Sequence, residues 1–185
     1  SSAGAAHVLN FGNEASFTMQ QFSELEHADV IVLHGTNPKI TFPQAFAKLK
    51  RNENARKVVI DPVRSDTALD LLAADPRNRH IRFEQGGDIL FNLCVARIIF
   101  ENNWQDDQYL STNVDESSIA AFKALCFQEK CEPTNVARQI ALEDQDPADV
   151  EVTIREYAAM VAKPDETGHR PRVAFVSSMG INQST

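Results

Sequence analysis

The sequence contains no apolar run that approaches the roughly 20 residues of a membrane-spanning helix. Its longest candidate, residues 89–100, is interrupted by Asn92 and Arg97. The start of the chain also lacks the basic and then apolar segment of a secretory signal. These absences predict a protein without a membrane span.

Cysteine is scarce, with Cys94, Cys126 and Cys131 as the whole complement. An odd count at irregular spacing argues against a disulfide framework, and a zinc or iron–sulfur site takes four ligands in paired spacings. His34 is expected to be packed or hydrogen-bonded, and the other histidines lack acidic or cysteine partners at metal-binding spacing. We therefore expect reduced, mostly packed thiols in a cytoplasmic protein, with no metal ligand in this chain. Nucleophile-elbow, zincin and P-loop patterns are missing too, so no catalytic residue is predicted here.

Basic residues are too few to balance the acidic ones, and the 185-residue chain carries a net charge of −8. A nucleic-acid-binding surface needs clustered Lys and Arg to neutralise phosphates, so none is expected, although a local basic pocket for an anion remains compatible. With 43% hydrophobic and 24% charged residues, the composition is that of a soluble globular domain. Because the chain begins at Ser1 without a methionine and stops inside a loop at Thr185, we expect a piece of a longer protein, truncated at its C-terminus.

The stretch from 28 to 61 is predicted to form a strand–turn–helix–strand unit around which the chain is organised. An apolar, β-branched run at 29–34 is typical of a buried strand, and a second strand is expected at 57–60. Between them, Gly35 and Asn37 tolerate the dihedral angles of a tight turn. Parallel strands joined this way form right-handed crossovers, and ligands bind outside their carboxyl ends.

The helix of this unit is expected to begin at Thr41. Thr41 would be its N-cap, Gln44 would complete a capping box, and Pro43 would lie in the first turn. The predicted buried face carries Phe42, Ala45, Phe46 and Leu49.

Two further strands are predicted at 80–83 and 172–177, the second of them buried. Helices are expected at 20–26, 65–72, 89–102, 106–111, 117–127, 135–142 and 150–161, each bounded by Asn, Asp, Ser, Gly or Pro signals. The predicted fold class is α/β, a Rossmann-like parallel sheet with helices on both faces plus a helical insertion at about 103–165. Residues 1–27 are assigned to part of a preceding domain and 28–185 to a dinucleotide-binding domain.

The first candidate site is the turn at Gly35 and Asn37. Backbone N–H groups in a turn that leads into the N-terminus of a helix can bind a phosphate, because the helix dipole and unpaired amides favour negative charge. A plain strand–helix turn explains the same residues.

Three charged residues near other predicted strand ends are further candidates. Asp61 has the position of a ribose-binding carboxylate in dinucleotide folds, or else initiates an Asp–Pro turn. Arg64 is either a phosphate or guanine contact or a solvated side chain. Asp88 precedes a predicted helix and is explained equally well as its N-cap.

Four motifs in chain order, at 28–38, 58–65, 86–88 and 178–183, carry a more specific signal. Together they resemble the large subunit of molybdenum and tungsten oxidoreductases that bind bis-molybdopterin guanine dinucleotide, the dimethyl sulfoxide reductase family. The resemblance implies that this chain holds one guanine dinucleotide, whose ribose or guanine Asp61 and Asp88 would contact. It further implies that Gly35, Asn37 and Thr41 approach phosphates and ribose, that Arg64 and Gly86 belong to the same site, and that Met179, Gly180 and Gln183 lie near the pterin and metal.

The chain departs from the family pattern at several positions. Ile40 replaces an acidic residue, Phe42 a histidine, Val63 an arginine, Gly87 a threonine and Ser184 a histidine. The Gln183–Ser184 pair resembles the one that is common at this position in assimilatory nitrate reductases, so the implied activity is nitrate reduction. Formate oxidation, or a non-catalytic electron-transfer scaffold related to the large iron–sulfur subunit of respiratory complex I, are the alternatives.

The family's iron–sulfur cysteine motif, its metal ligand and its closing C-terminal domain have no counterpart in this chain. The resemblance therefore implies that flanking domains of the same enzyme are its partners and supply the iron–sulfur cluster. A redox partner is also implied, and the sequence identifies neither that partner nor the metal as molybdenum or tungsten.

Overall fold

The computed structural model describes residues 25–177, which form two compact units. The described part of the first unit consists of residues 25–81 and 172–177, and the second unit is Arg82–Pro171. Met179, Gly180 and Gln183, together with most of the helix predicted at 20–26, lie outside the described residues.

The first unit is built on a four-stranded parallel sheet in the order β3-β2-β1-β4. Its strands are β1 (Val30–His34), β2 (Arg56–Ile60), β3 (Arg79–Ile81) and β4 (Val173–Ser177). Every neighbouring pair is parallel, which confirms the predicted α/β fold class. All five residues of β1 are buried, as its uninterrupted apolar run predicts.

The prediction that β4 is a buried strand is wrong. Among the described strands, β4 pairs with β1 alone and so lies at an edge of the sheet. The side chains of its five residues are half-buried or exposed, and Phe175 is 63% exposed. An apolar run alone does not distinguish a central strand from an edge strand, because both positions accept the same β-branched residues.

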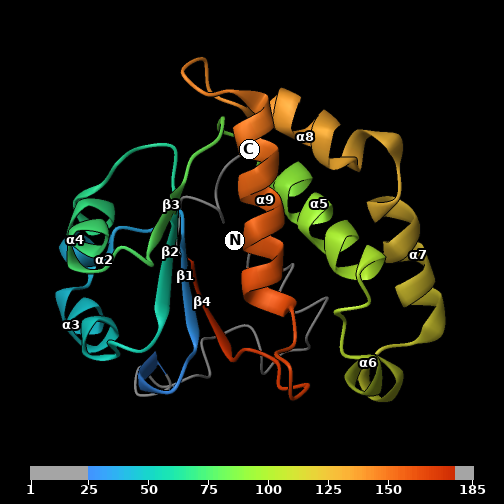
Figure 1. Ribbon diagram of the computed structural model, residues 1–185, viewed down its shortest axis with the longest axis horizontal. Helices are drawn as coiled ribbons and strands as arrows, with labels where there is room; N and C mark the ends of the chain where they lie inside the picture. Colours follow the sequence, from blue (N-terminus) through green and yellow to red (C-terminus); the bar gives the residue numbers. More distant parts are fainter. Residues whose placement is uncertain (1–24, 178–185) are drawn as a thin grey trace. The chain divides into compact units, whose positions relative to one another are not determined.

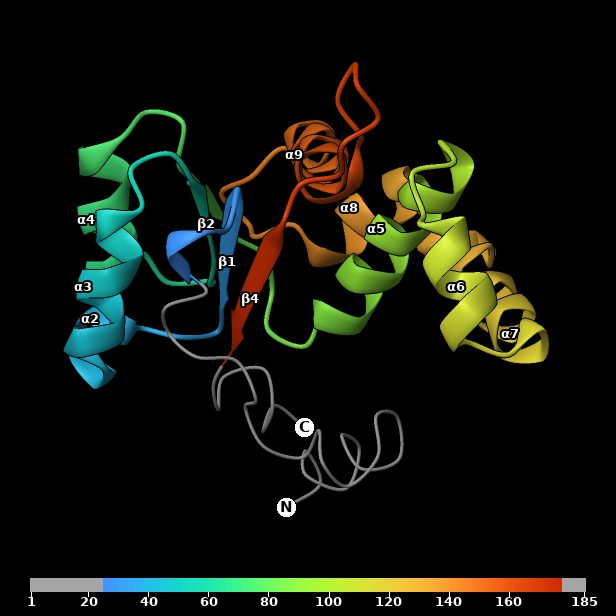
Figure 2. The same ribbon diagram turned by 90° about the horizontal axis from the view of Figure 1, so that it is seen from below.

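Three helices of this unit lie along one face of the sheet: α2 (Pro38–Thr41), α3 (Pro43–Arg51) and α4 (Asp66–Ala74) (Figures 1 and 2). Phe46 and Leu49 of α3 and Leu71 of α4 pack into one cluster with Ile31 and Leu33 of β1. On the other face, Val32, Val58 and Ile60 are buried as well.

The predicted start of the helix at Thr41 is wrong. Thr41 is the last residue of α2, and Phe42 separates α2 from α3 with φ −150° and ψ 69°. The separation follows from Pro43, whose ring disfavours helical dihedral angles in the residue before it and which has no N–H to continue the ladder. Phe42 is consequently 41% exposed and does not join the predicted buried face, and its side chain provides no capping hydrogen bond to α3.

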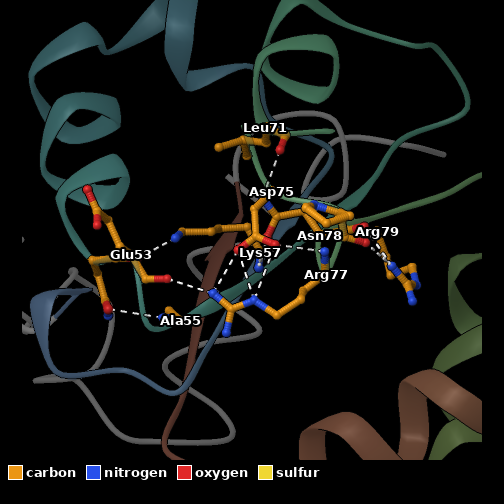
Figure 3. Close-up of polar contacts among 10 residues, drawn as sticks. Glu53, Ala55, Lys57, Leu71, Asp75, Arg77, Asn78 and Arg79 are labelled. Carbon is orange, nitrogen blue, oxygen red and sulfur yellow. Dashed lines mark hydrogen bonds and ion pairs between the residues drawn. The ribbon is translucent and has the colours of Figure 1, made fainter. Parts of the chain in front are cut away.

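Buried amides hold the amino ends of the strands (Figure 3). The Asn78 carboxamide accepts from the Lys57 backbone N–H at 2.8 Å and donates to the Leu71 carbonyl at 2.8 Å. Arg77 forms an ion pair with Asp75 at 2.7 Å. Burial lowers the pKa of Lys57, whose ammonium donates to the Asn52 carbonyl. The polar groups at this end of the sheet are thus largely used in holding the backbone.

The second unit is helical. It contains α5 (Asp88–Glu101), α6 (Asp107–Asn113), α7 (Glu116–Cys126), the 3-10 turn η3 (Glu129–Cys131), α8 (Pro133–Ile140) and α9 (Pro147–Ala162). Its core is centred on Phe91, whose ring stacks on Phe83 at 4.9 Å and lies 5.3 Å from Tyr157. The second unit includes α5, which precedes the predicted insertion of about 103–165. The assignment of residues 1–27 to a preceding domain stays a prediction.

Asp residues cap α6, α7 and α9 as the sequence signals predict, with Asp106, Asp115 and Asp146 each accepting from a backbone N–H of the first turn. All three cysteines are buried and unpaired, as expected. Burial raises the pKa of Cys94 to about 12 and that of Cys126 to about 11. Among residues 25–177, no helix combines the length and the apolar character needed to cross a membrane.

Helices α6 and α7 expose an unusual amount of apolar surface. No residue of α6 is buried, and Cys126 is the buried residue of α7. The exposed large apolar side chains of these helices and of the residues that end them are Tyr109, Val114, Phe122, Leu125 and Phe127. A short helix with no buried face gains little stability by itself, so this surface is suited to contact another apolar surface.

We therefore predict that the isolated chain self-associates at moderate concentration. Replacing Phe122 and Leu125 with Glu should reduce that association, because charged side chains resist desolvation. Light scattering across a concentration series measures the effect. Val152→Glu is the matched control, since Val152 is 55% exposed and α9 has no second exposed large apolar side chain. Monomeric behaviour of the unchanged chain throughout the series would contradict the prediction.

Two adjacent glycines before α5 are needed for different physical reasons. Gly86 has φ +85°, and a Cβ there would meet nothing within 4 Å. Gly87 has an ordinary φ of −74°, but a Cβ there would lie 2.9 Å from Ile140 Cγ2 and 3.0 Å from the Glu84 carbonyl oxygen. Ile140 thus occupies the space that the threonine of the resembled family would require at position 87.

Replacing either glycine with Ala should destabilise the chain, by about 1–2 kcal/mol at Gly86 through its left-handed backbone. At Gly87 the expected cost is about 1–3 kcal/mol, through crowding. Adding Ile140→Ala should make room for the Gly87→Ala methyl, so the double variant should be more stable than the sum of the single effects. Gly86→Ala should show no such coupling. Chemical denaturation of the three single variants and of the two double variants that combine each glycine change with Ile140→Ala tests both statements.

Candidate functional site

The strand order places a topological switch point between β1 and β4. From β1 the chain proceeds to β2 and β3 on one side of the sheet, whereas β4 lies on the other side of β1. Ligands of open parallel sheets bind outside the carboxyl ends of the strands at such a point. The loop after β1 begins with Gly35, and the loop after β2 begins with Asp61.

Gly35 turns the chain out of the sheet. Its N–H donates to the Ile60 carbonyl at 2.9 Å, which extends the β1–β2 pairing by one residue. Its φ of +60° lies in the left-handed region, where a residue with a Cβ is strained. The predicted tight turn is confirmed, and it directs the following backbone along the carboxyl edge of the sheet.

Asn37 lies at the start of α2, with its side chain fixed from one side. Asn37 Oδ1 accepts from Thr67 Oγ1 at 2.6 Å. The Asn37 carbonyl accepts from the backbone N–H of Thr41 at 3.0 Å and from Thr41 Oγ1 at 3.0 Å. Within the described part of the chain, Asn37 Nδ2 has no hydrogen-bond partner and is available to an acceptor. Thr41 therefore supports the turn, and its predicted contact with a ligand stays a prediction.

Asp61 directly follows β2 and is half-buried. Its Oδ1 accepts from the Val63 N–H at 2.8 Å, so the Asp–Pro turn interpretation is confirmed. Each carboxylate oxygen accepts more than one hydrogen bond, so the turn leaves capacity for a ribose hydroxyl. Arg64 is exposed between Asp61 and α4, where a phosphate or guanine contact stays a prediction.

Lysines near this edge are already paired. Asp70 of α4 binds Lys50 Nζ at 2.7 Å and Lys39 Nζ at 3.0 Å. Hydrogen bonds from Lys50 and then Lys39 hold the pKa of the Asp70 carboxyl below its usual range. An anion at this edge would therefore meet amide N–H donors and the guanidinium of Arg64 more readily than a free ammonium group.

Gly86 and Asp88 belong to the second unit. Gly87 occupies the N-cap position of α5 and Asp88 is the first helical residue, so the interpretation of Asp88 as an N-cap is wrong. A carboxylate in the first turn still benefits from the helix dipole. A single crevice that joins Asp88 to Gly35 and Asp61 stays a prediction.

Thr67, the partner of Asn37, is not among the site residues predicted from the sequence. Thr67 is fully buried and also accepts from the Lys39 N–H at 3.1 Å. A hydroxyl on the apolar face of α4, next to buried Ala68 and Leu71, was the available signal, because a buried polar group needs a partner.

The described residues at this edge offer a neutral amide donor, a guanidinium and a carboxylate. Donors of this kind suit phosphate oxygens and the carboxylate suits sugar hydroxyls, so the set fits the nucleotide end of a dinucleotide cofactor.

No established protein-family profile matches the chain. It is, however, 28% identical over 169 residues to a nitrate reductase of Shewanella frigidimarina (strain NCIMB 400). The matched stretch covers 89% of this chain and 16% of that protein. The chain is thus similar to a small part of a nitrate reductase.

Proposed function

We propose that this chain is part of a molybdenum or tungsten oxidoreductase and binds one guanine dinucleotide of a bis-molybdopterin guanine dinucleotide cofactor. The observation that carries the proposal is the convergence of Gly35, Asn37 and Asp61 at the carboxyl edge of a parallel sheet, beside its switch point. The similarity to a nitrate reductase supports nitrate as the substrate of the whole enzyme.

In this proposal each residue has a separate task. The side-chain amide of Asn37 meets a phosphate oxygen beside the turn at Gly35, while Asp61 accepts from ribose hydroxyls and Arg64 adds a positive charge. Asp88 accepts from the N1–H and the exocyclic amine of guanine, as a carboxylate with two adjacent oxygens can. Thr41 and Gly86 support the two loops, and Met179, Gly180 and Gln183 are proposed to lie near the pterin.

When bound, the cofactor supplies oxygen-atom transfer and electron conduction, and the protein contributes binding, orientation and electrostatics. The chain's own residues would hold the nucleotide end and so fix where the pterin and metal lie. Domains outside this chain would provide the metal ligand and the iron–sulfur cluster.

The first test concerns Asp61 in the full-length protein. Asp61→Asn keeps an oxygen that can accept from the Val63 N–H but removes the charge. A hydrogen bond to a charged group contributes about 1.5–3 kcal/mol, so the variant should carry less guanine nucleotide. Acid hydrolysis followed by chromatography measures the nucleotide per polypeptide.

Asp75→Asn is the matched control, because Asp75 also precedes a proline and accepts from a backbone N–H two residues on, at 2.8 Å. It lies before β3, at the opposite end of the sheet from Asp61. Equal nucleotide content in Asp61→Asn and the unchanged protein would remove Asp61 from the site.

The second test concerns Asp88. Asp88→Ala in the full-length protein should lower both guanine nucleotide content and activity while the thermal unfolding temperature stays close to that of the unchanged protein. Asp149→Ala, another carboxylate in the first turn of a helix, should leave the nucleotide content unchanged. If Asp88→Ala retains full cofactor and normal turnover, Asp88 does not contact the guanine.

A further inference from the structure

The hydrogen bond between Thr67 and Asn37 links two segments that are 30 residues apart. Thr67 lies in the first turn of α4 and is 0% exposed, whereas Asn37 is only half-buried at the carboxyl edge of the sheet. The Thr67 hydroxyl therefore reaches the candidate site from inside the fold.

The protons of this group can be assigned from its partners. The Lys39 backbone N–H donates to Thr67 Oγ1 at 3.1 Å and uses one of its lone pairs. The single hydroxyl proton then needs an acceptor, because water does not reach a fully buried hydroxyl. The atom at 2.6 Å must accept it, which identifies that atom as Asn37 Oδ1 and not Nδ2.

This assignment fixes the orientation of the whole carboxamide. With Oδ1 held toward Thr67, the Nδ2 amino group faces away from the hydroxyl and has no partner among residues 25–177. Asn78 differs, since both ends of its carboxamide are bonded to the backbone. Asn37 thus presents a neutral, oriented N–H donor.

We propose that Thr67 is a positioning residue that holds the Asn37 amino group ready to donate to a phosphoryl oxygen of the bound nucleotide. This inference rests on the proposed function. A phosphoryl oxygen is favoured over a carbonyl or hydroxyl because its negative charge strengthens the hydrogen bond that the neutral Nδ2 amino group donates to it. Lys39 does not compete for the same oxygen, because its ammonium is bound to Asp70 at 3.0 Å.

The test compares Thr67→Val with Thr67→Ser in the full-length protein. Val keeps the shape but removes the hydroxyl, whereas Ser keeps the hydroxyl and should behave like Thr. We expect guanine nucleotide to be lost during dialysis about five-fold faster from Thr67→Val, the change that one net hydrogen bond produces. Thr153→Val removes a helical hydroxyl that bonds to a backbone carbonyl in α9 and should retain nucleotide normally.

Asn37→Asp gives a second test that leaves Thr67 unchanged. The new carboxylate still accepts from the Thr67 hydroxyl but replaces the N–H donor with an oxygen that repels phosphate. We expect about ten-fold faster loss of nucleotide or more, with an unfolding temperature near that of the unchanged protein. This variant decides the matter if Thr67→Val does not fold.

The outcomes separate the inference from the proposed function. If Asp61→Asn loses nucleotide but Thr67→Val and Asn37→Asp retain it, the role of Thr67 is overturned and the proposed function stands. An equal fall in unfolding temperature and in retention for Thr67→Val and Thr67→Ser would show a merely structural role and would also overturn the inference. Absence of guanine nucleotide from the unchanged full-length protein would overturn both.

Discussion

The pairing of β1 on both of its sides is the constraint on which the first unit depends. Val30 is in register with Arg56 of β2 and with Val173 of β4, and all five residues of β1 are buried. Because backbone polar groups buried in this way must be hydrogen-bonded, the register permits little sliding of one strand along another. The carboxyl ends of β1 and β2 are thereby held level, which brings the loops that follow them to one edge.

The two ends of the sheet use similar side chains in different ways. At the amino end, Asn78 uses both ends of its carboxamide on the backbone, and Asp75 is bound to Arg77. At the carboxyl end, Asn37 Oδ1 accepts a hydrogen bond while Nδ2 stays available. Asp61 accepts one hydrogen bond, from the Val63 N–H within its own turn. One end therefore stabilises the fold, while the other retains hydrogen-bonding capacity that a ligand is suited to use.

The sequence was most informative where a single local signal dominates. Residues 29–34 and 57–60 are mostly apolar and rich in Val and Ile, and the observed strands differ from these predictions by one residue each. The helix start at Thr41 failed because the steric effect of Pro43 on Phe42 outweighed the capping-box pattern. Thr67 could not be assigned a role in advance, because its partner is distant in the chain and becomes visible only after folding. The same holds for Gly86 and Asp88, whose relation to Gly35 depends on tertiary arrangement and not on local pattern.

The neighbour relation between β1 and β4 also determines the order of events during synthesis. The hydrogen-bonded residues Asp29 and Arg172 are 143 positions apart, and the second unit is made between them. β2 and β3 emerge soon after β1, so one side of β1 is paired early while the other side keeps unpaired backbone N–H and C=O groups until β4 arrives. Closing so long a loop is entropically costly and slow, and unpaired strand edges attract other chains. The nascent protein therefore passes through a stage in which one side of β1 is open to association with other chains.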